Sequence, residues 1–267
     1  MNLDLSGKRA LVCGSSSGIG RAAAIELANL GAHVTLLARD AAKLQAVAIA
    51  LPRPKDQTHN FIAADLSNPE AVRAALAEHL DPSPQPLNPP PTILINNTGG
   101  PPGGTAVDAK AADLLACFNA QLLTAHALTQ LLLPAMKAAN YGRIVNITST
   151  SVKSPIPNLA ISNIIRPAVA AWAKCMSIEL ARFGITVNNV LPGYTKTDRL
   201  TSLFKARSEK QGVTIDKIEQ DVIAATPAGR FGEAHEIGSV IAFLCSPAAA
   251  YVNGINVPVD GGRLLTL

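Results

Sequence analysis

The sequence predicts one α/β domain built on a doubly wound parallel sheet with helices on both faces. Three observations carry this prediction. Short apolar runs of strand length alternate with longer stretches of helical apolar spacing along the chain. The 267 residues are 48% hydrophobic and 16% charged, which is enough apolar surface for one large core. No stretch has the length or composition of a domain linker. We therefore expect residues 1–267 to form a single domain.

The predicted strands and helices follow one another in strict alternation. The apolar runs interpreted as strands are 9–14, 33–39, 59–65, 92–97, 143–149, 185–193 and 254–260. The stretches with helical spacing are 19–30, 40–50, 69–80, 109–139, about 165–183, and 234–246. The Pro-rich segment 81–91 is interpreted as a turn. Because parallel strands need crossover connections, this order predicts βαβ units.

Composition and charge exclude several classes of protein. The net charge is +4 and the basic residues are scattered, so we expect neither a nucleic-acid surface nor a polybasic membrane anchor. The N-terminal segment has a short apolar run and an acidic residue, which is typical of neither a signal peptide nor a membrane span. The four cysteines are isolated and show no metal-ligand spacing. We therefore expect a cytoplasmic protein with reduced core cysteines and no metal.

The segment CGSSSGIG (13–20) lies between the first predicted strand and the first predicted helix. Gly14 permits a tight turn, Gly18 lets a pyrophosphate approach the backbone, and Gly20 allows close contact between helix and strand. The helix that follows adds free N–H groups and the positive end of its dipole. A glycine triplet alone would indicate a simple turn, but its place inside a βαβ unit predicts a nucleotide site.

The spacing G-x-x-x-G-x-G resembles that of the short-chain dehydrogenases/reductases, over almost the whole chain. Five further motifs match that family in order: AADLS (63–67), NNTGG (96–100), GRIVNITS (142–149), VNNVLPGYTKT (187–197) and YVNGINVPVDGG (251–262). The resemblance implies a single Rossmann-type domain that binds a nicotinamide dinucleotide and acts on a ketone or alcohol, including 3-oxoacyl substrates. It also implies a homodimer or homotetramer formed through the long helix (109–139) and the helix after Pro167.

The resemblance also implies a set of cofactor contacts. Gly14, Ser16, Ile19 and Gly20 would hold the pyrophosphate, Asp65 and Leu66 the adenine edge, and Asn96 the ribose region, while Pro192, Gly193 and Thr195 would flank the nicotinamide.

The end of the second predicted strand bears on the choice between NAD and NADP. NAD-using members of the family usually carry an acid where Ala38 stands, because a carboxylate accepts hydrogen bonds from the ribose and repels a 2′-phosphate. Arg39 follows as a bidentate partner for that phosphate. Against this, Arg39 is also compatible with a solvated position, and Ser17 stands where NADP-using members often have a second basic residue. We predict NADP(H) in preference to NAD(H).

The chain departs from the family at its catalytic positions. The resemblance implies a serine that orients the carbonyl, a tyrosine that exchanges the proton, a lysine four residues later and an asparagine that supports a relay water. Ser149 matches the serine, but Ser162 stands in the tyrosine's place and Arg166 in the lysine's place. Gln121 stands in the asparagine's place, and Asn119 is two positions away, about 200° of helix rotation. An aliphatic hydroxyl is a far weaker acid than a phenol, and a guanidinium cannot shuttle a proton.

Two residues leave the chemistry open. Pro167 predicts either a kinked helix or a helix that begins near this residue, and a late start would put Ser162 and Arg166 on different faces. Arg166 remains a candidate ribose contact if it faces the cofactor. Tyr194, with Lys196 near it in sequence, is interpreted either as a replacement proton donor or as a residue that lines the substrate pocket.

The segment 198–230 falls where the family keeps a mobile substrate lid. Its basic residues, among them Arg199, are interpreted either as an attraction for an anionic substrate or as a solvated amphipathic face. Two functions stay open. One is an NADP(H)-dependent oxidoreductase with a non-standard proton donor and a small carbonyl or alcohol substrate. The other is a catalytically degenerate nucleotide-binding homologue that serves as a sensor, subunit or scaffold.

Overall fold

A seven-stranded parallel sheet forms the centre of the molecule. The computed structural model describes residues 1–80 and 89–266. The strand order is β3-β2-β1-β4-β5-β6-β7, and every neighbouring pair is parallel. The strands are β1 (Arg9–Cys13), β2 (His33–Ala38), β3 (His59–Ala63), β4 (Ile93–Asn96), β5 (Gly142–Ile147), β6 (Ile185–Pro192) and β7 (Asn256–Val259). The doubly wound parallel sheet predicted from the sequence is confirmed.

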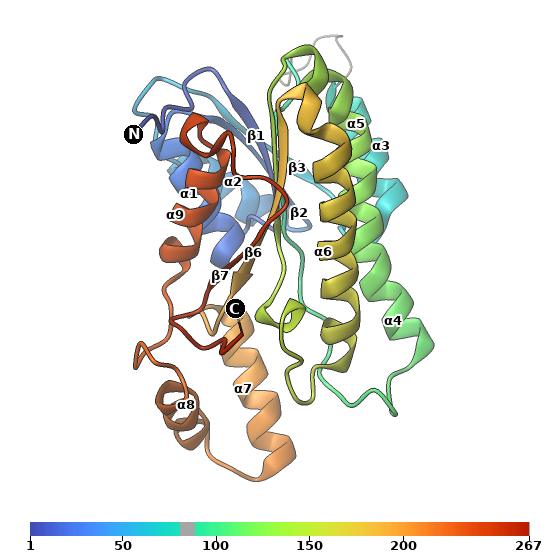
Figure 1. Ribbon diagram of the computed structural model, residues 1–267, viewed down its shortest axis with the longest axis vertical. Coiled ribbons are helices and arrows are strands. Elements are labelled where there is room, and N and C mark those ends of the chain that lie inside the picture. The colour runs from blue at the N-terminus through green and yellow to red at the C-terminus, as the bar shows by residue number, and fades with distance from the viewer. Residues whose placement is uncertain (81–88, 267) are drawn as a thin grey trace.

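Helices cover both faces of this sheet (Figure 1). One face carries α1 (Gly18–Asn29), α2 (Ala41–Ala50) and α9 (Ala234–Cys245). The other carries α3 (Pro69–Leu80), α4 (Ala111–Phe118), α5 (Thr124–Ala138) and α6 (Ala160–Leu180). Each face has its own apolar core, with Leu27 and Ile241 fully buried in one and Leu76 and Leu128 in the other. Burying one such side chain contributes about 1.5–3 kcal/mol, so the two cores fix the strand ends on which a site can be built.

The long helix predicted over 109–139 is divided into two. α4 ends at Phe118, a π-helical turn covers Asn119–Leu123, and α5 begins at Thr124. Single π-turns widen a helix locally and are frequent at functional sites. Within this turn Gln121 is the residue that points into the protein.

Helix α6 begins at Ala160, five residues before the predicted start, and continues through Pro167. The side chain of Asn163 accepts a hydrogen bond from the N–H of Ile156 (3.1 Å) and donates one to its carbonyl oxygen (2.9 Å). These bonds fasten the preceding loop to the first turn of the helix, and Pro167 removes only one backbone donor. The alternative of a late start is therefore wrong, and Ser162 and Arg166 lie one turn apart on the same face.

The segment 198–230 contains two helices that were not predicted, α7 (Asp198–Gln211) and α8 (Ile215–Ala224). The hydroxyls of Thr197 and Thr214 cap their first turns, and Gly212, at a φ of +64°, ends α7. The two helices share a small apolar core with Phe204 and Ile218 at its centre. These capping residues were the signal in the sequence that could have identified both helices.

Other predictions have mixed outcomes. Most of the Pro-rich turn, 81–88, lies outside the described residues. Cys13, Cys117 and Cys245 are unpaired and buried as predicted, whereas Cys175 is exposed on α6. Within the described ranges, no helix combines the length and apolar character needed to cross a bilayer.

Candidate functional site

A cleft of about 1000 Å³ opens at the carboxyl ends of the strands, where parallel sheets place their ligand sites. Its wall joins the loop after β1, the end of β2, the loops after β3 to β6, and the first turns of α6 and α7. The predicted site residues that line it are Gly14, Ser16, Ser17, Gly18, Ile19, Arg39, Asp65, Leu66, Ser149, Ser162, Arg166, Pro192, Gly193, Tyr194 and Thr195. Gly20, Asn96 and Gln121 do not reach this wall.

The glycine loop after β1 has the shape that a pyrophosphate requires. Gly14 and Gly18 have φ values of +59° and +56°, which L side chains rarely adopt. A Cβ on Gly14 would lie 2.5 Å from Nδ2 of Asn97, and a Cβ on Gly20 would collide with the carbonyl oxygen of Gly14. The N-terminal turn of α1 carries no side-chain cap, so its N–H groups are free to bind an anion. The loop therefore fits the pyrophosphate of a dinucleotide, and Gly20 provides the close helix contact that was predicted.

The end of β2 presents cations, and its nearest acid is already engaged. Ala38 is buried, whereas Arg39 and Asp40 are exposed. Asp40 accepts a hydrogen bond from the backbone N–H of Lys43 (3.0 Å) and lies 3.6 Å from its ammonium group. The hydrogen bond from that N–H, supported by the ammonium charge, holds the pKa of Asp40 below its ordinary value. Within the described residues, no carboxylate lies within ion-pair distance of Arg39.

At the other end of the cleft, α6 presents Ser162 and Arg166 side by side. Ser162 is buried at the cleft wall. Nη1 of Arg166 donates a hydrogen bond to the carbonyl oxygen of Ile147 (2.6 Å), while its Nε is buried without a hydrogen-bond partner. Burial lowers the pKa of Arg166 to about 10. The guanidinium therefore stays cationic at neutral pH and retains N–H groups for a ligand.

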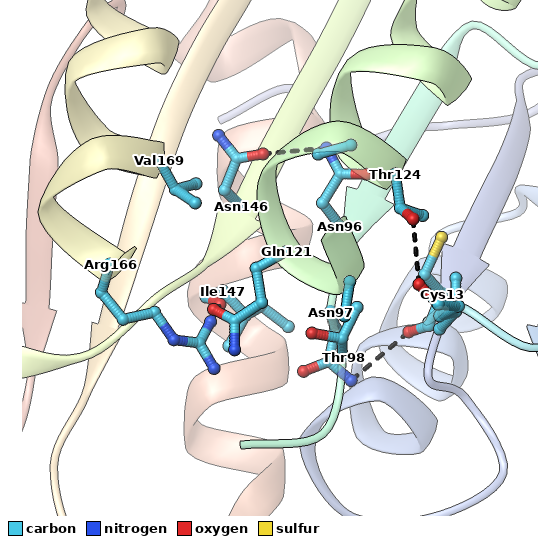
Figure 2. A pocket seen from close by; sticks show the side chains of 13 residues that line it. Cys13, Asn96, Asn97, Thr98, Gln121, Thr124, Asn146, Ile147, Arg166 and Val169 are labelled. Carbon is cyan, nitrogen blue, oxygen red and sulfur yellow. Dashed lines mark hydrogen bonds between the residues drawn. The ribbon is translucent and has the colours of Figure 1, made fainter. Parts of the chain in front are cut away.

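Behind the cleft lies a small recess of about 10 Å³, which has room for one water molecule. Figure 2 shows Gln121 and Arg166 pointing toward each other across it. Oε1 of Gln121, like Nε of Arg166, is buried without a partner, and Nε2 of Gln121 donates a long hydrogen bond (3.4 Å) to the carbonyl oxygen of Gly99. Asn119 lines neither space. Gln121 and Arg166, which stand in the places of the family's catalytic asparagine and lysine, therefore face each other here.

A row of asparagines supports this end of the sheet. Asn96, Asn146, Asn189 and Asn256 stand opposite one another on β4, β5, β6 and β7. Each Nδ2 donates to Oδ1 of the next residue, at 2.8, 2.9 and 2.8 Å. Asn96 is thus engaged within the sheet, and Asn97 is the asparagine that lines the cleft. The ribose contact expected for Asn96 stays a prediction.

Ser149 has a hydroxyl that is available to a ligand. Its Oγ accepts a hydrogen bond from the N–H of Ser151 (3.1 Å), and the residue lines the cleft. A hydroxyl that accepts in this way keeps its own proton free to donate. Ser149 is therefore suited to hold a carbonyl oxygen.

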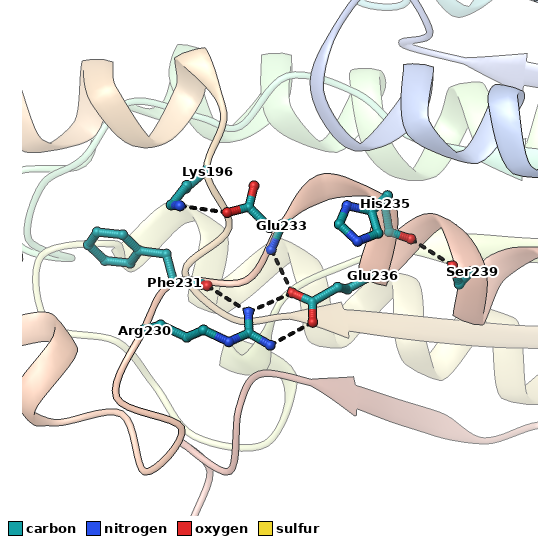
Figure 3. A network of polar contacts seen from close by, with 7 residues as sticks. All are labelled: Lys196, Arg230, Phe231, Glu233, His235, Glu236 and Ser239. Atoms are coloured by element: carbon teal, nitrogen blue, oxygen red, sulfur yellow. Dashed lines mark hydrogen bonds and ion pairs between the residues drawn. The ribbon is translucent and has the colours of Figure 1, made fainter.

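Tyr194 lines the cleft from the loop after β6. Its ring packs against Phe204 with centroids 5.9 Å apart, and the guanidinium of Arg263 lies 4.5 Å from the ring centroid. Lys196 forms an ion pair with Glu233 (Figure 3). The cation nearest to Tyr194 in sequence is therefore engaged elsewhere.

The loop that carries Tyr194 is fastened to the start of α9. Thr195 pairs with Gly232 as a short parallel bridge. Arg230 makes a fork of two hydrogen bonds to Glu236 (2.8 and 2.7 Å), as Figure 3 shows. The Arg230 hydrogen bonds lower the pKa of Glu236 to about 2. This network holds the end of segment 198–230 against the site.

The cleft also contains residues that were not predicted individually. The structure separates Arg199, which lines the cleft, from Lys205 and Arg207, which do not. Helical phase could have made this distinction if α7 had been recognised. Arg263 reaches the cleft from the segment after β7, and no sequence pattern indicated it.

Comparison with known proteins agrees with this arrangement. A family model described as enoyl-(acyl carrier protein) reductase matches residues 14–263. The chain is 34% identical over 266 residues to the 3-oxoacyl-[acyl-carrier-protein] reductase FabG of Pseudomonas aeruginosa, covering 99% of this chain and 100% of FabG. It is 28% identical to the NADPH-dependent reductase BacG of Bacillus subtilis, covering 98% and 100%. The L-sorbose reductase of Gluconobacter frateurii, solved with NADPH and L-sorbose, matches with a TM-score of 0.90 and 30% identity over 100% of both chains. The chain belongs to the short-chain dehydrogenase/reductase family of NAD(P)-dependent reductases and dehydrogenases.

Proposed function

We propose that the protein is an NADP(H)-dependent oxidoreductase that reduces a ketone or oxidises an alcohol, with a non-standard proton donor. One observation carries the proposal: a single cleft has Arg39 and the glycine loop at one end and Ser149, Ser162, Arg166 and Tyr194 at the other. Its relatives include an NADPH-dependent reductase and a 3-oxoacyl reductase. A 3-oxoacyl type of substrate is therefore part of the proposal.

The preference for NADP(H) rests on Arg39. Its exposed guanidinium forms no ion pair within the described residues, although its charge acts on Asp65, and it lines the cleft beside the glycine loop. Titrations that follow nicotinamide fluorescence should show tighter binding of NADPH than of NADH. Arg39→Gln should weaken NADPH binding about tenfold and leave NADH binding unchanged, since one charge-assisted contact is lost. Equal affinity for both nucleotides would contradict the preference, and binding of neither would contradict the whole proposal.

We call the end of the cleft with Ser149, Ser162, Arg166 and Tyr194 the chemical end, and its residues have separate roles in this proposal. When bound, the nicotinamide supplies or accepts the hydride. The hydroxyl of Ser149 donates a hydrogen bond to the carbonyl oxygen and so orients the substrate. Arg166 uses the N–H groups that Ile147 does not occupy to bind ribose hydroxyls. Gln121 positions Arg166 across the small recess. Ser162 is assigned to orienting the substrate and not to proton transfer, because an aliphatic hydroxyl does not release a proton near neutral pH.

The proton donor has to be another group, and Tyr194 is the tyrosine of the cleft wall within the described residues. Replacing Tyr194 by phenylalanine keeps the ring packed on Phe204 and removes the hydroxyl alone. If Tyr194 is the donor, Tyr194→Phe should lower kcat about a hundredfold with little change in NADPH affinity. Unchanged turnover would exclude Tyr194 and leave water in the cleft as the proton source.

The alternative is a catalytically degenerate homologue that binds the nucleotide and acts as a sensor, subunit or scaffold. The observation that favours it is the pair Ser162 and Arg166, which holds a hydroxyl and a cation but no group able to exchange a proton. NADPH oxidation would be followed with diketones, 3-oxoacyl thioesters and aldehydes. A native protein that binds NADPH but turns over none of them, with activity appearing in Ser162→Tyr/Arg166→Lys, would establish the alternative.

We also propose that the protein forms a homodimer or homotetramer through α4, α5 and α6. Leu115, Ile164 and Ile178 are 60%, 48% and 70% exposed on these helices, which is costly for large apolar side chains in water. Light scattering after gel filtration should give a mass of two or four chains. Replacing Ile164 and Ile178 by Lys should shift that mass toward one chain, and a native monomer would contradict the proposal.

A further inference from the structure

Two guanidinium groups line the chemical end of the cleft, and the charge of one acts on the other. Arg166 comes from α6 and Arg199 from the first turn of α7, and both line the cleft. In the part of the chain that the structure describes, neither forms an ion pair with a carboxylate. Their positive charges repel each other, and burial adds a desolvation cost to each. An anion bound between them would remove both penalties.

Arg199 is held in a fixed position rather than extended into solvent. Its Nη2 donates a hydrogen bond to the carbonyl oxygen of Pro101 (2.7 Å). Its guanidinium also lies against Gly100, where a Cβ would come within 3.0 Å of Nε and Nη2. The remaining N–H groups are therefore presented on a planar group that is already ordered, which lowers the entropic cost of binding a carboxylate.

The position of Arg199 in α7 points in the same direction. A cation in the first turn of a helix is unfavourable, because it faces the positive end of the helix dipole. Thr197 already caps this turn and Asp198 places a carboxylate in it, so the guanidinium of Arg199 is the group here that favours a negative ligand. Arg166 adds a second cation and Ser149 adds a hydroxyl donor. A neutral ketone would use the hydroxyl and leave both cations without a counter-ion.

We propose that Arg199 forms a subsite for the carboxylate of a short oxo-acid substrate or of the corresponding hydroxy acid, while Arg166 adds its positive charge and keeps its N–H groups for the ribose. The proposal rests on the oxidoreductase function proposed above and specifies its substrate class. The competing anion is the cofactor pyrophosphate, because Thr197, two residues before Arg199, lies beside Gly18. The contacts of Arg199 with Gly100 and Pro101 favour the substrate side, since the loop that holds these residues pairs at Gly104 with Leu159, at the start of α6.

The test compares acetoacetate with its neutral methyl ester by calorimetry, both with NADP⁺-saturated protein and without nucleotide. NADP⁺ cannot reduce either ketone, so binding is measured free of turnover. The native protein should bind the acid about tenfold more tightly than the ester, and added salt should reduce this preference. Arg199→Gln should remove the preference. Lys205→Gln, an exposed site on the same helix, should retain it.

The outcomes separate the subsite from the proposed function. Equal binding of acid and ester by the native protein, or a preference that survives Arg199→Gln, would overturn the subsite. If Arg199→Gln instead weakens NADPH binding tenfold or more, Arg199 binds the pyrophosphate and the proposal is wrong. A native protein that binds no nucleotide but keeps an Arg199-dependent preference for the acid would overturn the oxidoreductase function and leave the anion subsite standing.

Discussion

The row of asparagines across the sheet predicts that Asn146 is far more important for stability than Asn256. Asn146 accepts a hydrogen bond from Asn96 and donates one to Asn189, whereas Asn256 only accepts one from Asn189. Asn146 and its two partners are 1%, 9% and 3% exposed. Asn256 lies partly exposed on the edge strand β7. The two positions therefore differ in the number of bonds and in access to water.

The magnitude follows from the groups that each substitution leaves unpaired. Asn146→Ala leaves Nδ2 of Asn96 and Oδ1 of Asn189 without partners in the interior, and each such group costs about 1–3 kcal/mol. The expected loss in the free energy of unfolding is therefore about 2–6 kcal/mol. Asn256→Ala removes one bond at an edge that water can reach, so its cost should be about 0.5–1.5 kcal/mol.

Urea denaturation followed by circular dichroism measures both losses, provided that the slope of free energy against urea stays the same. The far-ultraviolet spectrum of each variant in buffer is the control for an intact fold. The reasoning would be refuted if Asn146→Ala cost no more than Asn256→Ala. That result would mean that water enters the sheet and replaces the amide at position 146.

Three further predictions test the site. Gly20→Ala should lower stability by about 1–3 kcal/mol through overpacking and should also abolish the thermal stabilisation by NADPH, measured by thermal melts with and without nucleotide. Gln121→Leu should lower the free energy of unfolding by about 1–3 kcal/mol if a water joins Gln121 to Arg166, whereas a gain would show that Oε1 was unpaired. Glu236 has its pKa lowered to about 2 by Arg230, so its stabilising effect is complete above its ordinary pKa of 4.5 and is lost as pH falls toward 2. The melting temperature of the native protein should therefore drop more steeply over this range than that of Glu236→Gln, and parallel curves would contradict the role of this pair.

The strands and the glycine loop could be predicted because their signals are local. Each buried strand is a short apolar run, and the glycines stand where the backbone itself approaches another backbone, as Gly20 does to Gly14. The kinked helix at Pro167 was left open for a physical reason. The bonds of Asn163 to Ile156 that stabilise the early start join residues seven apart, and no propensity argument includes them.

The composition of the chemical end could be predicted only in part, because side chains meet there from distant segments. The position of Gln121 opposite Arg166 depends on a π-helical turn that no periodicity indicated. Asn96 and Asn97 are neighbours in sequence, and only the register of β4 against β5 shows that the first belongs to the sheet and the second to the cleft. Arg263 enters from the end of the chain.

The chemical end keeps a cation, Arg166, but has no general acid at Ser162. The first feature is evidence about ligand binding and the second is evidence about proton transfer. A guanidinium that is partly buried, hydrogen-bonded to one carbonyl and close to a second cation costs free energy in the ligand-free protein. Loss of a general acid costs nothing in stability, so an inert site could lose it freely. Retaining the expensive group is understandable only if a ligand compensates it. Arg166 is therefore a stronger argument for binding at this end of the cleft than Ser162 is an argument against chemistry there.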